Sequence, residues 1–208
     1  IFTAQTSFNS KNPAQRYVDS TENGLTMVNF TADEYYSSDT GAILGSAKDE
    51  YSFHIVSKVE YVDNKNDAIL SIKDMAGKRK SINLRAGVDT PTDPGDFYFE
   101  PHFEYQLGTN SYSKVRTTDH ANSQLSIFSF LMKGVGTTSE TRINGATVVS
   151  EASAQTKSFS SSYQININTN HNLSKGADTL IGEFVALNSA NLSLNQKVEG
   201  YLAHKWGN

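Results

Sequence analysis

Cysteine is absent from this chain of 208 residues, and charge is sparse. Without cysteine there can be no disulfide framework, thiol catalysis or cysteine-ligated zinc. Charged residues make up 19% of the chain and the formal net charge is −4. Because nucleic-acid binding needs clustered lysine and arginine, we expect no nucleic-acid partner. The most continuous apolar stretch, Leu125 to Met132, is far shorter than the ~20 residues of a membrane-spanning helix, so we expect no membrane span.

Uncharged polar residues replace the missing charge and apolar mass. Serine, threonine and asparagine together fill 61 of the 208 positions. These residues favour strands, turns and wet binding surfaces, and argue against a helix bundle. We therefore expect one β domain spanning residues 1–208, located extracellularly, at a cell surface or on a virion surface. Because the chain begins at Ile1, we expect a processed product or part of a larger chain, and homo-oligomeric assembly stays open.

Apolar and polar residues alternate along much of the chain, as in half-buried strands. Between Tyr51 and Val59, the residues Tyr51, Phe53 and Ile55 share one face. Many short strands with frequent turns predict an all-β fold, a two-sheet antiparallel β-sandwich (jelly roll) with a short C-terminal helix. About ten strands are expected, among them 25–30, 51–59, 69–72, 81–84, 97–105, 112–116, 125–132, 142–148, 163–169 and 179–187.

The strongest hairpin signal is the pair Asn144-Gly145 between β-forming residues. A type I′ turn needs positive φ at both central positions, and this pair tolerates it. The sequence therefore predicts a tight hairpin here.

One helix is predicted at the end of the chain. Ser193-Leu-Asn-Gln196 has the pattern of a capping box, in which the serine accepts from an amide of the first turn. Leu194, Val198 and Tyr201/Leu202 recur at helical spacing and predict one apolar stripe. Gly207 is a suitable C-terminal stop.

The C-terminal segment resembles the signature of LamG-like jelly rolls of the concanavalin A-like lectin/glucanase superfamily. The matching residues are the strand containing Ile181-Gly-Glu183, the Leu192-Ser193 cap and the segment Glu199-Gly-Tyr-Leu-Ala-His-Lys-Trp-Gly207. The paired strands around Asn144-Gly145 resemble the family's "NG" hairpin. The resemblance covers about the last 85 residues and implies two stacked antiparallel sheets, with ligand sites on the concave face or rim. It implies no reaction, because such a fold carries many functions. We expect Trp206 and Tyr201 to pin the helix against the sandwich.

No catalytic residues are predicted. Glycoside hydrolases need two carboxyl groups roughly 5–9.5 Å apart. The nearest pair on one strand, Glu100 and Glu104, would lie about 13 Å apart at ~3.3 Å per residue. Gly134-Val-Gly136 stands alone and indicates a turn, so neither a phosphate-cradling loop nor an organic cofactor is expected.

Calcium is the metal that the sequence favours, because hard cations prefer several oxygen ligands. The best candidate ligands are Asp89, Asp93 and Asp96, in a loop that also contains two prolines. The segments 63–67 and 119–122 are oxygen-rich alternatives. All three compositions are also those of ordinary turns.

The ligand-binding candidates lie near this loop. Tyr98 and Tyr105 belong to a dense aromatic segment and could stack on a sugar ring, while Asn110 and Asp119 accept hydrogen bonds from hydroxyls. Burial between the sheets is an equally good interpretation of these aromatics. We predict a non-catalytic module that binds a carbohydrate or another surface ligand, as part of an adhesin. Two alternatives stay open: a virion protein such as a capsid decoration or tail-fibre domain, and a polysaccharide-degrading enzyme.

Overall fold

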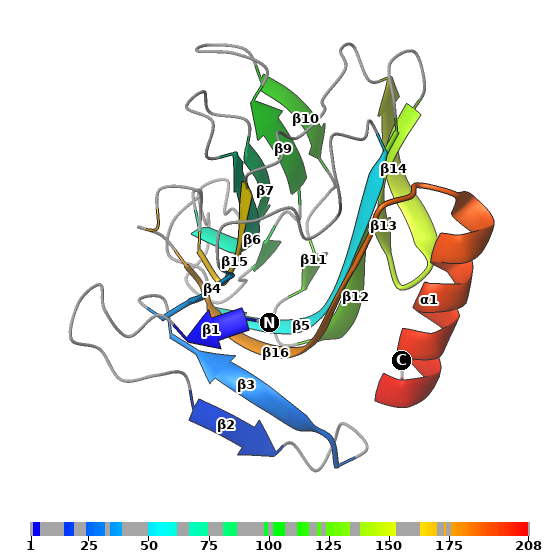
Figure 1. Ribbon diagram of the computed structural model, residues 1–208. Helices are drawn as coiled ribbons and strands as arrows, with labels where there is room; N and C mark the ends of the chain where they lie inside the picture. The colour runs from blue at the N-terminus through cyan, green and yellow to red at the C-terminus, as the bar shows by residue number, and fades with distance from the viewer. Residues whose placement is uncertain are drawn as a thin grey trace.

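The computed structural model describes sixteen strands and one helix (Figure 1). The described residues are 2–4, 15–18, 24–31, 34–38, 50–61, 67–74, 81–86, 98–99, 102–106, 112–116, 120–121, 124–133, 138–152, 163–169, 173 and 176–207.

Two seven-stranded antiparallel sheets form the body of the fold. Sheet A runs in the order β1 (Phe2–Ala4), β4 (Tyr36–Ser38), β15 (Tyr163–Ile167), β6 (Asp67–Asp74), β7 (Ser81–Ala86), β9 (His102–Gln106) and β10 (Tyr112–Arg116). Sheet B runs in the order β14 (Ala146–Ala152), β13 (Thr138–Ile143), β12 (Leu125–Met132), β5 (Tyr51–Tyr61), β16 (Asp178–Leu187), β3 (Thr26–Phe30) and β2 (Gln15–Val18). A separate pair joins β8 (Tyr98–Phe99) to β11 (His120–Ala121). The predicted β-sandwich is confirmed, and its strands outnumber the ten expected because several are only two to four residues long.

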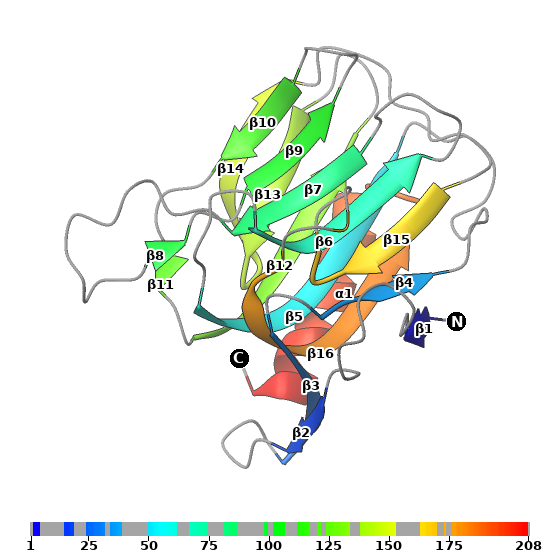
Figure 2. The same cartoon turned by 90° about the vertical axis from the view of Figure 1, so that its left-hand side faces the viewer.

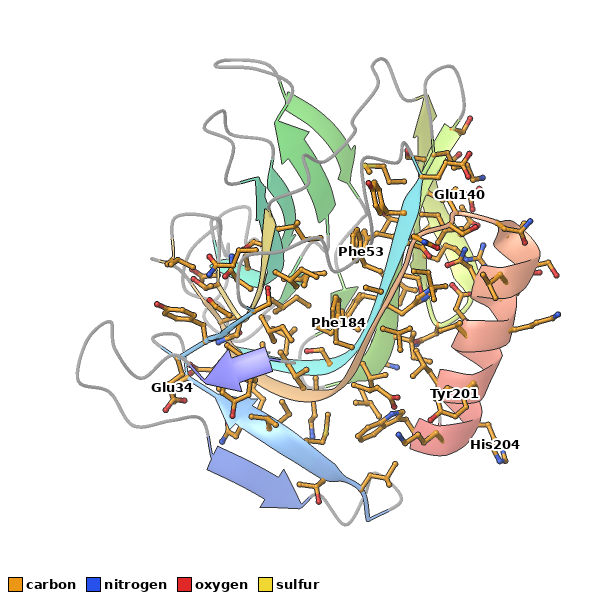
Figure 3. All side chains as sticks on the ribbon, viewed as in Figure 1. Glu34, Phe53, Glu140, Phe184, Tyr201 and His204 are labelled. Carbon is orange, nitrogen blue, oxygen red and sulfur yellow. The ribbon has the colours of Figure 1, made fainter. Side chains whose placement is uncertain are left out.

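The main core fills the space between the sheets. Tyr51, Phe53 and Ile55 of β5 point into it together, as their alternation predicted. Phe53 stacks on Phe184 of the neighbouring strand β16, with ring centroids 6.4 Å apart (Figure 3). Burying large apolar side chains of this kind supplies most of the free energy of folding.

The Asn144-Gly145 turn joins β13 to β14 with positive φ at both residues, 50° and 79°. The Asn144 side chain also continues the ladder to β12, because its Oδ1 accepts from the Ile127 amide at 2.8 Å. The backbone N–H of Asn144 in turn donates to the Ile127 carbonyl at 3.0 Å. The predicted hairpin is confirmed and is bonded to the central strand.

Asn168 links the two sheets at the end of β15. Its φ is 60°, and its buried Nδ2 lies 2.9–3.1 Å from the carbonyl oxygens of Thr31, Glu34 and Ala177. Its Oδ1 accepts from the Thr179 hydroxyl at 2.9 Å. Asparagine is one of the few residues that accept this backbone conformation, so one side chain here fixes segments of both sheets.

Helix α1 (Leu192–Trp206) closes the chain and packs on the outer side of sheet B (Figure 1). Its N-cap is Asn191 and not the predicted Ser193, because the Asn191 side chain accepts from the Leu194 amide at 3.0 Å. Gly207 ends the helix with φ 75°, as predicted.

The predicted apolar stripe of α1 is confirmed at Val198 and Leu202 and wrong at Leu194 and Tyr201. Leu194 and Tyr201 are 41% and 52% exposed. The buried positions of the helix are Asn195, Glu199, Leu202 and Trp206. Trp206 therefore pins the helix as expected, whereas Tyr201 does not.

Candidate ligand-binding face

Sheet A has a face turned away from the core, and α1 lies behind the opposite sheet (Figure 2). Strand register identifies the residue rows of each face, because alternate residues of a strand belong to opposite faces. Two rows contain the buried core residues of β15 and β6, which places them on the inner face. They are Ile167, Leu70, Leu84, Phe103 and Val115, and Ile165, Ile72, Ile82, Tyr105 and Ser113.

The rows that alternate with these consist mainly of polar residues; the exceptions are Ala68, which is buried and pairs with Arg85, and the aromatic Tyr112. We call these positions the polar face of sheet A. Its middle row, from β4 to β10, is Ser37, Asn166, Ser71, Asn83, Glu104 and Lys114. On one side follow Gln164, Lys73 and Ser81, with Gln106 paired to Tyr112. On the other side Arg85 pairs with His102, and His102 with Arg116.

One end of the polar face is a hydrogen-bonded network across three strands. The Ser37 hydroxyl donates to Asn166 Oδ1 at 2.7 Å, and Asn166 Nδ2 donates to the Ser71 hydroxyl at 3.3 Å. All three side chains are buried. This end therefore satisfies its own polar groups, as buried polar groups generally must. The charged positions of the middle row belong to β9 and β10, at the far edge of the sheet.

A second polar cluster lies between sheet B and α1. The buried ring of His54 contacts the Ser129 hydroxyl through Nδ1 at 2.8 Å and Asn195 Oδ1 through Nε2 at 2.7 Å. Because Asn195 Nδ2 already donates to the Asn191 carbonyl at 2.7 Å, its Oδ1 is the acceptor. His54 therefore carries its proton on Nε2 and accepts from Ser129. Burial lowers the pKa of His54, so the ring is held neutral.

Next to this histidine, Arg142 and Glu199 form a buried, bidentate ion pair. Arg142 Nε and Nη2 donate to the two carboxylate oxygens at 2.8 and 3.0 Å. Arg142 also donates to the Thr147 hydroxyl at 2.6 Å and to the Gly145 carbonyl. The hydrogen bond to Glu199 raises the pKa of the Arg142 guanidinium despite its burial. The guanidinium thus ties the Asn144-Gly145 hairpin to the helix.

This cluster has the residue types of a hydrolytic site, but its location is that of a structural junction. His54, Ser129 and Asn195 are 0% exposed, and α1, which carries Asn195, covers the other two. A nucleophile must reach a substrate atom, and here both ring nitrogens of the base are already occupied. The cluster positions the helix.

Two of the predicted ligand-binding residues lie in described strands. Tyr98 pairs with Ala121 in the β8–β11 ribbon, and Tyr105 pairs with Ile82 in an inner row of sheet A. Ligand contacts by either tyrosine stay predictions. Asn110, Asp119 and the predicted calcium ligands Asp89, Asp93 and Asp96 lie outside the described residues, as does Glu100.

Sequence reasoning missed the polar face. The printed sequence shows that polar residues recur at every second position in three of the strands: Asn83 and Arg85, His102 and Glu104, and Lys114 and Arg116. Only strand register shows that these positions adjoin one another. Within the described part of the chain, no group of three or more histidine, aspartate or glutamate residues could hold a metal ion, and none of the helical residues forms a segment suited to crossing a bilayer.

No protein-family model and no curated protein sequence matches the chain. Solved structures are similar to it in fold. Domain 4 of AbnA, an extracellular GH43 arabinanase of Geobacillus stearothermophilus solved with arabinotriose, aligns with a TM-score of 0.68 at 14% identity. That alignment covers 96% of this chain and 87% of the arabinanase domain.

Two further structures are similar. The binding domain of botulinum neurotoxin serotype G has a TM-score of 0.65 at 11% identity, covering 94% of this chain and 49% of that one. The CBM40 of Ruminococcus gnavus IT-sialidase, bound to α2,3-sialyllactose, has a TM-score of 0.60 at 9% identity. That alignment covers 84% of this chain and 96% of the CBM40 chain. At these identities the likeness establishes the fold alone, which is a β-sandwich.

Proposed function

We propose that the chain is a non-catalytic carbohydrate-binding module that holds its ligand on the polar face of sheet A. One observation carries this proposal: the rows of sheet A that alternate with its core rows consist mainly of hydroxyl, amide and charged residues, with the buried Ala68 beside Arg85 as the aliphatic exception. Sugar hydroxyls both donate and accept, so a planar array of such groups suits an oligosaccharide. The fold likeness to domains solved with arabinotriose and sialyllactose supports the same ligand class.

A binding role agrees with the charge pattern of this face better than catalysis does. Glu104 is the single carboxylate among its register positions on β6, β7, β9 and β10. Glycoside hydrolysis uses a pair of carboxyl groups. We expect no reducing sugar to be released from a polysaccharide panel, and its release would overturn the non-catalytic assignment.

The direct test is binding to a glycan array that contains neutral and acidic oligosaccharides. We expect saturable binding that Asn83→Ala, in the middle row, weakens about tenfold, the effect of losing one to two hydrogen bonds. Asn188→Ala, an exposed asparagine after β16 in sheet B, is the matched control and should bind normally. Equal affinity of both variants would place the ligand elsewhere, and no binding at all would overturn the proposal.

We further propose that the module acts outside the cell as part of an adhesin and orders its 89–96 loop around calcium through Asp89, Asp93 and Asp96. Carboxylate oxygens are the ligands that calcium prefers. Thermal melts with calcium and with a chelator should then differ, because a ligand of the native state raises the midpoint. Identical midpoints would remove the calcium proposal, and beads coated with the module that fail to attach to glycan-bearing cells would remove the adhesive role.

Membership of the LamG-like group also belongs to this proposal. What supports it is the contact between the two parts of the signature, since the Trp206 ring lies directly over Gly182 of the Ile181-Gly-Glu183 strand. Trp206 Nε1 donates to Glu183 at 3.1 Å. The motif is thus one packing unit in this fold.

A further inference from the structure

Basic residues gather at one end of the polar face. Arg85, His102 and Arg116 occupy one row across β7, β9 and β10, and Lys114 stands in the adjoining row. Neighbouring strands lie about 4.8 Å apart and alternate residues of one strand about 6.7 Å apart, so these four positions fall within about 12 Å of one another. Three separate strands thus form a basic cluster that no run in the sequence contains.

The cluster is strongly unbalanced in charge. Glu104, between Asn83 and Lys114 in the middle row, is the one acidic residue at these positions. In a chain whose formal net charge is −4, the negative charge lies elsewhere. Like charges at such spacing repel one another, so an anion that binds among these positions relieves the repulsion.

We infer that this basic cluster selects a glycan that carries carboxylates, such as one with sialic or uronic acid residues. The inference rests on the proposed function and narrows its ligand class. Arginine binds carboxylate through two parallel hydrogen bonds, which gives both strength and orientation. The neutral Asn83 and Ser81 positions beside the cluster suit the hydroxyls of the same sugar. The cluster spans two strand spacings, which matches one or two sugar rings and is small for a nucleic-acid backbone.

The test uses pairs of probes that differ only in the carboxylate: α2,3-sialyllactose against lactose, and polygalacturonate against its methyl ester. We expect the intact chain to bind at least one acidic probe ten times more tightly than its neutral partner. Arg85→Gln should abolish most of that preference, and raising sodium chloride from 50 to 500 mM should weaken binding of the acidic probe.

Lys197→Gln is the matched control, because it removes one charge from an exposed position of α1. It should leave the preference intact. Should Arg85→Gln fail to fold, Arg116→Gln on the edge strand β10 replaces it, and melting midpoints identify the folded variants.

The outcomes separate this inference from the proposed function. Binding of neutral probes with no acidic preference, unchanged in Arg85→Gln, overturns the inference and keeps the carbohydrate-binding function. Binding of single-stranded DNA as tightly as the best acidic glycan also overturns it, in favour of a general polyanion surface. Binding of no glycan overturns both.

Discussion

Helix α1 rests on sheet B through two unlike halves. The first half lies on polar groups, with Asn195 over His54 and Glu199 against Arg142. The second half lies on apolar ones, where Leu202 and Trp206 pack with Met27, Val56, Leu125, Ile127 and Leu180. The apolar half can gain most of the docking free energy by excluding water. The polar half accepts only one position of the helix, because a shift of one residue would break its hydrogen bonds.

The largest effect is expected in the apolar half. Trp206→Ala should lower the free energy of unfolding by about 3–5 kcal/mol, since it empties a filled site under the last helical turn. Urea denaturation followed by circular dichroism measures it. A loss below about 1 kcal/mol would show that the helix end contributes little.

Gly182 provides a double-mutant cycle for the same contact. A Cβ there would lie 2.4 Å from the Trp206 ring, so Gly182→Ala should cost about 1–3 kcal/mol in the intact chain. In the Trp206→Ala background it should cost almost nothing. Gly200→Ala is the control, because its Cβ meets nothing and the change should stabilise α1 by about 0.5–1 kcal/mol. Equal costs of Gly182→Ala in both backgrounds would exclude the ring as the cause.

The polar half should respond next, and differently to single and paired changes. Arg142→Met leaves the Glu199 carboxylate buried without its cation, and should cost about 3 kcal/mol. Replacing both residues by methionine should recover most of that loss, because the desolvation of both charges disappears. Denaturation of the two variants gives the comparison. A double variant as unstable as Arg142→Met would mean that the pair adds net stability.

A smaller effect should appear as pH dependence through His54. Its pKa in the folded chain is lowered by burial, so the unfolded chain binds a proton first as pH falls. His54 therefore does not lower the free energy of unfolding above pH ~6.5. Below that pH the free energy of unfolding falls by up to about 1.4 kcal/mol per pH unit. Unfolding measured from pH 7.5 to 5 should show this slope.

The comparison variant for that slope is His54→Gln, which removes the titrating ring and should flatten the profile between pH 6.5 and 5. His204→Gln, at an exposed position of α1, is the control for replacing a histidine elsewhere in the chain. A slope that survives in His54→Gln would assign the acid sensitivity to other groups.

The contrast between the two halves also explains what the sequence could predict. Alternation in β5, the Asn144-Gly145 turn and the Gly207 stop are local signals, and all three are confirmed. The buried stripe of α1 was predicted correctly at Val198 and Leu202 but wrongly in the first half of the helix, which meets His54 and Arg142. Against such partners Asn195 and Glu199 are buried while Leu194 is exposed.

The basic cluster of sheet A could not be predicted for a related reason. Arg85, His102 and Arg116 come from three strands, and adjoin only once the pairing of β7, β9 and β10 is known. The alternation of apolar and polar residues shows which face of a strand each residue belongs to. Which residues adjoin on neighbouring strands depends on the register of the strands, and the turns and the core together determine that register.

The smallest effect expected is at the start of α1, where the polar half begins. Asn191→Ala should cost about 1 kcal/mol, because its side chain caps the Leu194 amide. Ser193→Ala, at the position the sequence favoured, lies inside the first turn and should change stability by only a few tenths of a kcal/mol. Thermal or urea unfolding of the two variants compares them directly. Because the Asn191 carbonyl also accepts from Asn195, which holds His54, a frayed first turn should loosen the histidine contact as well. If Ser193→Ala cost more stability than Asn191→Ala, Ser193 would be the N-cap, and the cap would not be linked to the contact between Asn195 and His54.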